Sequence, residues 1–313
     1  MPAIIQSALH PAGPQAASIS HLWWLMFWTC SVVYVVVIGA LLVAIRRRRD
    51  EGGSTDERSL TRSVAAATGV TVVILFGLLF ASVATGRAVA SLGSAEGLVI
   101  DVTGNQWWWD VTYENPTPSL QVKTANELHI PVGRQVRIQL KSNDVIHSFW
   151  VPNLHGKMDL IPGRQTAIWL QADTPGVYRG QCAEYCGLQH ANMALTVIAE
   201  ASDDFERWLV AQRQPAPPPA SPEQQRGLEV VERGPCAMCH TVVGTSAGGR
   251  TAPDLTHIAT RSTIAAGTAP NTRGYLAGWI TDPQHMKPGA KMPSTGLSAD
   301  ELQAVLAYLE TLK

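Results

Sequence analysis

The sequence has few charged residues and no excess of either sign. Asp, Glu, Lys and Arg make up 16% of its 313 residues, and 24 basic residues face 25 acidic ones. A nucleic-acid-binding protein needs a basic surface, so this balance argues against that class. Soluble proteins carry about 25% charged residues and disordered chains are rich in charge, so the chain fits neither class. We expect about two folding units, with part of the chain in lipid.

Two long segments contain no charged residue. Residues 22–45 and 64–86 lack Asp, Glu, Lys and Arg, and about 20 apolar residues suffice to span a bilayer. We predict a transmembrane helix in each, with an N-terminal tail at residues 1–21 and a connecting loop at residues 46–63. A buried hairpin in a soluble core is the alternative, but neither segment has a polar face for water.

The basic residues indicate which way this hairpin is oriented. The predicted loop holds six arginines, residues 1–21 hold no Lys or Arg, and only Arg87 lies between the second span and Lys123. Cytoplasmic loops are the ones enriched in Lys and Arg. We therefore expect a multi-pass protein of the bacterial inner membrane, with the loop in the cytoplasm and both termini on the periplasmic side.

The remaining sequence divides at a proline-rich joint. Residues 92–213 contain short β-rich runs broken by turn residues, which is typical of an all-β sandwich or Greek-key barrel. Residues 214–222 are rich in proline and predict an extended tether. Residues 223–313 predict a helical domain whose last helix begins at a capping box, Ser298 to Glu301. The predicted strands are residues 98–102, 107–113, 135–141, 145–151, 166–170 and 193–198.

Five cysteines cannot all pair within one chain, and four of them lie in two motifs. Cys236, Cys239 and His240 form the C-x-x-C-H pattern of covalent c-type haem, in which the thiols bind the porphyrin and the histidine binds the iron. A redox C-x-x-C pair is the alternative, but it would be expected beside a βαβ pattern. We expect one haem c with Met292 as the sixth iron ligand, and Met286 as its competitor.

The second motif gathers soft ligands. Cys182, Cys186, His190 and Met193 lie close together, and His147 precedes them in the chain. Thiolates, imidazoles and a thioether select copper over hard cations. Because two sulfurs can bridge two ions, we predict a binuclear copper centre. A disulfide or a zinc site is the alternative, but either would leave Glu184, His190, Met193 and the upstream His147 without a role.

These motifs together make the chain resemble subunit II of a haem-copper cytochrome c oxidase, of the kind with a cytochrome c domain fused to its C-terminus. The resemblance implies a two-helix hairpin, a cupredoxin-like Greek-key domain with a copper A centre, and a class I cytochrome c domain. It also implies that the Pro253 carbonyl accepts a hydrogen bond from the His240 ring, and that Glu184 reaches a magnesium ion shared with subunit I. The implied copper A ligands are His147, Cys182, Cys186, His190, Met193 and the backbone carbonyl of Glu184.

An aromatic run is part of the same resemblance. Trp107, Trp108 and Trp109 are similar to the family's segment over the copper site, where Trp107 matches the tryptophan that receives electrons. A place in the buried core is the alternative for all three, and it is the favoured one for Trp108 and Trp109. Two features depart from the family: Asn105 stands where a histidine is usual, and the second span has no Glu. The family's proton route through this subunit therefore does not follow from this sequence.

The resemblance implies a proton-translocating cytochrome-c oxidase. Electrons would pass from the c-type haem to copper A and then to subunit I, where oxygen is reduced to water. The implied partners are subunit I, subunit III, membrane lipid, and a donor such as a quinol-cytochrome c reductase or a small cytochrome c. The tether would keep the cytochrome domain near copper A and permit it to swing. A copper A subunit of a nitric oxide reductase and a non-enzymatic periplasmic copper-binding protein remain the alternatives.

Overall fold

The computed structural model describes residues 4–50, 57–91 and 97–313. It has two compact units, one formed by Gln15–Leu92 and the other by Met1–Pro14 together with Gly93–Lys313.

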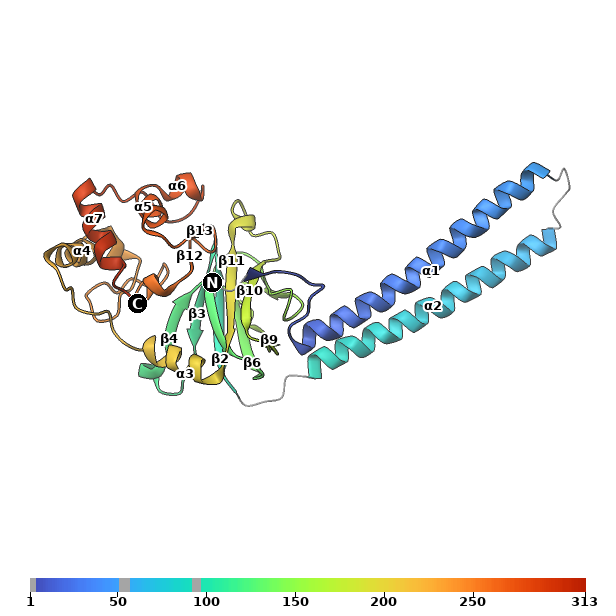
Figure 1. Cartoon of the computed structure of the whole chain (residues 1–313), viewed down its shortest axis with the longest axis horizontal. Coiled ribbons are helices and arrows are strands. Elements are labelled where there is room, and N and C mark those ends of the chain that lie inside the picture. Colours follow the sequence, from blue (N-terminus) through green and yellow to red (C-terminus); the bar gives the residue numbers. More distant parts are fainter. Residues whose placement is uncertain (1–3, 51–56, 92–96) are drawn as a thin grey trace. The chain divides into compact units, whose positions relative to one another are not determined.

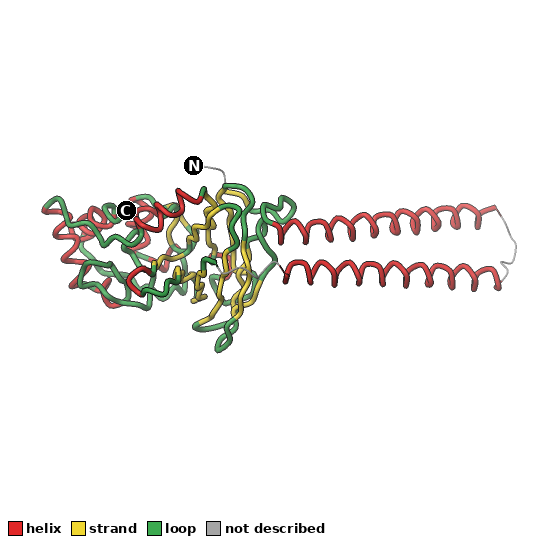
Figure 2. The backbone as a smooth tube through the Cα atoms, turned by 90° about the horizontal axis from the view of Figure 1, so that it is seen from below, coloured by secondary structure: helices red, strands yellow, loops and turns green. Residues whose placement is uncertain are grey.

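The first unit is a pair of long helices. Helix α1 spans Pro14–Asp50 and helix α2 spans Glu57–Ser91, and the two run side by side (Figure 1, Figure 2). Both are long and apolar enough to cross a membrane, and their most apolar stretches have no buried side chains. Each helix is longer than the charge-free segment predicted to span the membrane, because the helical backbone continues into the polar residues at both ends. The middle of the predicted loop, residues 51–56, lies outside the described residues.

The second unit contains a β sandwich of two sheets, which we call the sandwich domain (residues 97–213; Figure 1). The first sheet has the order β4-β3-β2-β6-β9, with β2 (Val99–Asn105), β3 (Trp108–Tyr113), β4 (Val122–Ala125), β6 (Val136–Ser142) and β9 (Thr166–Leu170). The second has the order β5-β11-β10-β7-β8, with β5 (Glu127–Pro131), β7 (His147–Trp150), β8 (Met158–Leu160), β10 (Gly176–Cys182) and β11 (Ala194–Glu200).

Alternating side chains build the core between these sheets. Every second residue of β2 and β3 is buried, as expected for strands with one face against a core. The six predicted strands are present; β9 has the predicted ends, and the other five have shifted ends. Strands β4, β5, β8 and β10 were not predicted. Strands β4, β5 and β8 are short, polar residues such as Lys123 and His129 interrupt the pattern in β4 and β5, and β10 contains two glycines.

The N-terminal segment belongs to the second sheet. Strand β1 (Ile4–Ile5) pairs in parallel with Val177 and Tyr178 of β10. Asn153 fixes the residues that follow, because its Nδ2 donates to the His10 carbonyl (2.7 Å) and its own carbonyl accepts from the Ala12 amide (2.7 Å). The sequence predicted only a tail here, since a two-residue strand is too short to show a period.

The chain ends in helical structure. Helix α3 (Ser202–Ala211) still belongs to the sandwich domain, where it buries Phe205 and Leu209 in the core.

Residues 223–313, the C-terminal domain, have a separate hydrophobic core. Its helices are α4 (Pro222–Arg233), α5 (Arg273–Thr281), α6 (Pro283–Met286) and α7 (Ala299–Leu309), and a short hairpin pairs β12 (Thr263–Ile264) with β13 (Ala269–Pro270). Short 3-10 turns are η1 (Pro118–Leu120), η2 (His190–Asn192), η3 (Pro235–Met238) and η4 (Ile258–Thr260). The predicted capping box at the start of α7 is confirmed.

The proline-rich linker is held against the C-terminal domain. The Ala216 amide donates to the Val243 carbonyl (2.8 Å), and Nε2 of His257 lies 3.1 Å from the carbonyl oxygens of both Gln212 and Gln214. The predicted tether is therefore held against the C-terminal domain at this end of the linker. Its composition gives an extended backbone, but the partners of that backbone come from residues far along the chain.

Helices α4 and α7 cross at Gly227. A Cβ atom at this position would lie 2.6 Å from the carbonyl carbon of Ala304 and 2.8 Å from the Cβ of Tyr308. Side-chain carbon atoms do not approach backbone so closely without displacement. The close crossing therefore depends on the absence of a side chain at residue 227.

We predict that Gly227→Ala weakens this helix pair by about 1 to 3 kcal/mol, the usual cost of overpacking, although alanine favours an isolated helix. Amide hydrogen exchange in α7, measured in the full chain, should accelerate by about 5- to 100-fold. The matched control is Gly278→Ala in α5, where a Cβ meets no atom within 4 Å. The control should be neutral or stabilising, and equal effects of both substitutions would contradict the prediction.

Candidate functional site

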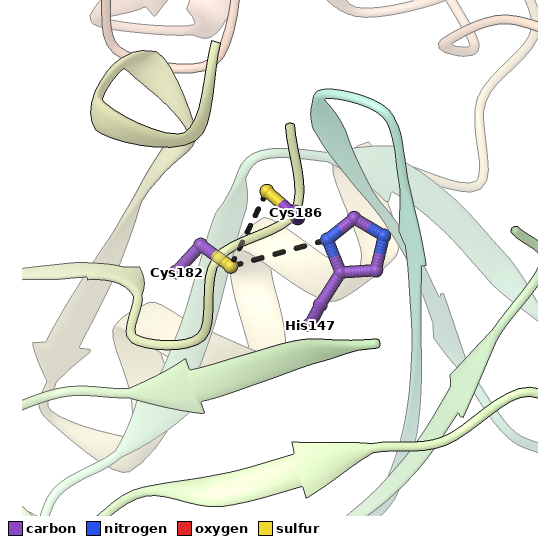
Figure 3. Close-up of side chains that lie close together, drawn as sticks. All are labelled: His147, Cys182 and Cys186. Carbon is purple, nitrogen blue, oxygen red and sulfur yellow. Dashed lines mark hydrogen bonds between the residues drawn. The ribbon is translucent and has the colours of Figure 1, made fainter. Parts of the chain in front are cut away.

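Two buried thiols lie at the centre of the candidate site. Cys182 ends strand β10 and Cys186 lies in the loop after it, and their Sγ atoms are 3.7 Å apart (Figure 3). Both cysteines are free, and each is 2% exposed. The disulfide alternative is therefore not supported. The pair presents two sulfur atoms to the same small volume.

Cys182 is accompanied by a nitrogen and an oxygen. Nδ1 of His147, at the start of β7, lies 3.9 Å from its sulfur and faces it in Figure 3. The backbone carbonyl oxygen of Glu184 lies 3.2 Å from the same sulfur. The Glu184 carboxylate instead lies near Lys157, at 3.4 Å from Nζ, with a side chain that is 45% exposed. The expectation that this side chain turns away from the sulfurs agrees with the geometry.

Cys186 is accompanied by a nitrogen and a second type of sulfur. Nδ1 of His190 lies 3.6 Å from its Sγ, and the thioether Sδ of Met193 lies 3.8 Å from it. Both residues belong to the segment that returns the chain to β11. Cys186, His190 and Met193 therefore converge because one loop folds back on itself between two neighbouring strands.

The two sheets bring His147 to this loop. Strand β7 pairs with β10, where Phe149 is opposite Cys182. On the other sheet, Gly104 of β2 makes room for the imidazole, since a Cβ there would lie 2.8 Å from Cδ2 of His147. The sequence motif does not show this requirement, because Gly104 is far from both cysteines in the chain.

Protonation of the thiol pair is strongly coupled. A hydrogen bond from the Cys186 thiol, together with contacts to His147 and nearby backbone, holds the pKa of Cys182 well below its usual range. The hydrogen bond to Cys182 and burial raise the pKa of Cys186. One thiol thus ionises readily and the other resists, so a cation is needed before both become thiolates. That is the electrostatic setting in which a metal ion binds cysteine.

Asp144 orients His147, and the sequence reasoning gave it no role. Its Oδ1 lies 2.8 Å from Nε2 of His147, on the opposite side of the ring from Cys182. Its Oδ2 accepts from the backbone amide of Gln106 (2.7 Å). Carboxylates commonly hold the second ring nitrogen of a metal-ligating histidine in this way. The signal in the sequence was an acidic residue three positions before the histidine.

Trp107 lies directly against the sulfur loop. Its indole Nε1 donates to the Cys186 carbonyl (3.0 Å), which also accepts from Nε2 of Gln106 (2.8 Å). Trp109 is completely buried in the core, as expected. The corresponding expectation for Trp108 is wrong, because it is only half-buried and lines a cavity. The alternation of β3 places Trp109 inward and Trp108 on the opposite face of the strand, whereas Trp107 precedes the strand and is buried against the Cys186 loop.

That cavity forms the second part of the site. It has a volume of about 440 Å³, within the usual range for a bound organic group. Cys236, Cys239 and His240 line it from the C-terminal domain, and Trp107 and Trp108 line it from the sandwich domain. One cavity therefore touches both the C-x-x-C-H motif and the tryptophan beside Cys186.

The His240 ring has one nitrogen fixed by the protein. Its Nδ1 donates to the Pro253 carbonyl at 2.7 Å, which confirms the expected contact. Burial lowers the pKa of His240, and this keeps the imidazole neutral. Nε2 is thereby left with its lone pair. Met292 lines the same cavity, whereas Met286 packs against the hydrophobic core, so the geometry favours Met292 as the second axial ligand.

We predict that Asp144→Asn lowers the pKa of His147 in the metal-free chain. Burial lowers this pKa, but hydrogen bonds to Cys182 and Asp144 outweigh it and raise the pKa above 6.5. A neutral amide cannot stabilise the imidazolium in the same way. Titration of the ring by NMR should show a lower midpoint for Asp144→Asn, and an unchanged one for Asp173→Asn, whose side chain is exposed. An unchanged His147 midpoint in Asp144→Asn would rule out the orienting role.

Two family models match the chain. Residues 116–200 match the family described as cytochrome c oxidase subunit II, periplasmic domain, and residues 224–313 match the family described as cytochrome c. The first match includes Cys182 and Cys186, and the second includes the motif at Cys236.

Curated relatives agree with these matches. The chain is 40% identical over 215 residues to cytochrome c oxidase subunit 2 of Alkalihalophilus pseudofirmus, covering 68% of the chain and 61% of the relative. It is 33% identical over 227 residues to the same subunit of Bacillus sp. PS3, covering 69% of the chain and 62% of the relative. The chain thus spans about three fifths of the length of these relatives.

Among solved structures, the chain is similar to the periplasmic domain of subunit II of cytochrome oxidase from Bradyrhizobium japonicum. The identity is 30%, the match covers 38% of this chain and 95% of that one, and the TM-score is 0.36. From the two family models and the curated relatives, the chain is similar to cytochrome c oxidase subunit II, with a cytochrome c domain following the part that matches the periplasmic domain.

Proposed function

We propose that the chain is the subunit through which electrons enter a proton-translocating cytochrome-c oxidase. One observation carries the proposal: the indole of Trp107 is hydrogen-bonded to the loop of Cys186 and also lines the cavity that contains His240. Two donor sets suited to redox metals thus meet at one aromatic side chain. A protein that only stored copper would have no use for the second set.

The residues around the thiol pair fit a binuclear copper centre. Such a centre would supply rapid one-electron transfer when bound, because two copper ions at this site would share one electron. The chain's part is to hold the thiolates 3.7 Å apart, to exclude water by burying them, and to fix the His147 ring through Asp144. The groups that would hold copper are His147, Cys182, Cys186, His190, Met193 and the carbonyl of Glu184.

The cavity in the C-terminal domain fits a c-type haem. Its thioether bonds would form at Cys236 and Cys239, with His240 and Met292 as axial ligands. When bound, the haem supplies a one-electron couple whose potential is raised by methionine ligation. The Pro253 carbonyl holds the His240 ring through Nδ1, which leaves the neutral Nε2 as the ring nitrogen that would bind the iron.

The partners follow from the same assignment. Subunit I would accept the electron and reduce oxygen, and subunit III and a separate electron donor would complete the complex. The Glu184 carboxylate is exposed and carries a hard oxygen ligand, which supports a magnesium ion shared with subunit I. Its neighbour Lys157 would have to move aside for a cation to bind there.

The membrane topology is part of the proposal. Strand β1 precedes the helical hairpin in the chain and pairs with β10 of the sandwich, which follows the hairpin. The segments before α1 and after α2 must therefore lie on the same side of the membrane. The six arginines between the spans put the hairpin loop in the cytoplasm. Both redox domains would then face the periplasm.

Electron paramagnetic resonance of the full chain, purified in detergent and loaded with copper and haem, tests the copper assignment. We expect seven hyperfine lines, because two equivalent copper nuclei share one electron, and two coppers per haem. Cys186→Ser should abolish this pattern by removing a bridge, whereas Cys30→Ser in α1 should leave it unchanged. A four-line spectrum, or a copper-to-haem ratio near one, would refute the binuclear centre.

The optical spectrum of the oxidised chain tests the axial ligand. A sulfur–iron bond gives a weak charge-transfer band, and we expect Met292→Leu to abolish it. Met286→Leu is the matched control and should retain the band, since Met286 is partly buried and packs against the hydrophobic core. Loss of the band in Met286→Leu alone would mean that Met286, and not Met292, is the sixth iron ligand.

A further inference from the structure

Lys287 is a buried lysine that the proposed function leaves without a role. It follows helix α6, and its side chain is 2% exposed. Its Nζ donates to three carbonyl oxygens, those of Trp107 (2.8 Å), Asn192 (2.7 Å) and Ala265 (2.9 Å). An ammonium group has three donors, so its hydrogen-bonding capacity is fully used. Two of the acceptors belong to the sandwich domain and one to the C-terminal domain.

A buried carboxylate reaches across in the opposite direction. Glu127 of strand β5 is 4% exposed, and its Oε1 accepts from the backbone amide (2.8 Å) and the hydroxyl (2.6 Å) of Ser262. Ser262 belongs to the C-terminal domain. Each domain therefore inserts one charged side chain toward the other, where Lys287 finds two of its three acceptors and Glu127 finds two donors of Ser262.

Close backbone contacts surround these two side chains. The Ala194 amide donates to the Ala266 carbonyl (3.0 Å), so a backbone hydrogen bond joins the start of β11 in the sandwich domain to the C-terminal domain. At Gly289, whose φ is +85°, a Cβ would lie 3.1 Å from Leu188 and 3.4 Å from the Trp107 ring. A side chain at residue 289 would thus be both strained and crowded, which ties this loop to the Trp107 face.

The charges make the contact specific for one orientation. Removing a lysine or a carboxylate from water costs several kcal/mol, and the cost is offset only where hydrogen bonds replace the lost water. At Lys287 this cost lowers the pKa of the ammonium group to about 7, because burial disfavours its charged form. If the C-terminal domain were rotated or shifted, Lys287 and Glu127 would lose these partners together. The two buried charges therefore act mainly by disfavouring other orientations of the C-terminal domain on the sandwich domain. They stabilise the observed orientation to a smaller extent.

We propose that Lys287 is a positioning residue that locks the C-terminal domain onto the sandwich domain. In this arrangement the cavity of His240 opens onto Trp107, and the partner that fits the Trp107 face is the chain's own C-terminal domain. The locked contact does not require copper or haem. Only its benefit, a fixed path between the two redox sites, rests on the proposed function.

Hydrogen exchange of the full chain in detergent, loaded with copper and haem, tests the lock. The amides of Ala194 and Ser262 report the contact, because each donates across it. We expect Lys287→Met, which keeps the length but removes the donors, to accelerate exchange at both amides by about tenfold or more. Lys123→Met is the matched control on an exposed lysine of β4 and should change neither. Unchanged protection in Lys287→Met would overturn the proposal.

Amides in the two cores separate loss of docking from loss of folding. Exchange at Val111 of β3 and Leu306 of α7 should stay at the wild-type rate in Lys287→Met, and copper content should be unaltered. Acceleration at these core amides as well would mean that Lys287 supports folding rather than docking, and would also overturn the proposal. If Lys287→Met does not accumulate, Lys287→Gln, a shorter neutral donor, carries the same test with a smaller expected acceleration.

The two proposals fail independently. A single-copper spectrum would refute the copper centre and leave the exchange result standing. Unchanged exchange would refute the lock and leave the metal content and the spectra standing.

Discussion

Two buried thiols that share little space govern the architecture of the sandwich domain. Cys182 and Cys186 cannot both be thiolates without a positive charge between or beside them, because neither is close to water. The loop from β10 to β11 supplies neutral donor groups from His190 and Met193, and β7 supplies His147. The two sheets hold these segments in place. The fold thereby keeps the two sulfur atoms at a fixed separation and out of contact with water.

Much of this could be predicted from the sequence because the motifs are local. The spacing of Cys182, Cys186, His190 and Met193 is compact enough that one loop must bring them together. The C-x-x-C-H motif at Cys236 fixes its own chemistry in the same way. The hairpin follows from the absence of charge, and the six strands follow from short β-rich runs bounded by turn residues. Which atoms bind metal stays a prediction, although the structure brings the expected side chains together.

The parts that could not be predicted all depend on contacts between distant residues. Asp144 has a role only because β7 places the His147 ring beside it. Trp108 was expected in the core, but the alternation of β3 places its side chain on the face that lines the cavity. The composition of the proline-rich linker predicts an extended tether, but it does not show that His257 contacts the linker backbone. Lys287 gives no signal at all, since nothing near it in the sequence shows that its three acceptors exist.

Strand β1 has a consequence for how the protein is made. It pairs with β10, the strand that ends at Cys182, although the whole hairpin separates the two in the chain. In the proposed topology these segments cross the membrane in separate events, one before the first span is inserted and one after the second. The sheet is complete only when both crossings have succeeded. A wrongly inserted chain would therefore have an incomplete sheet at the strand that leads to Cys182.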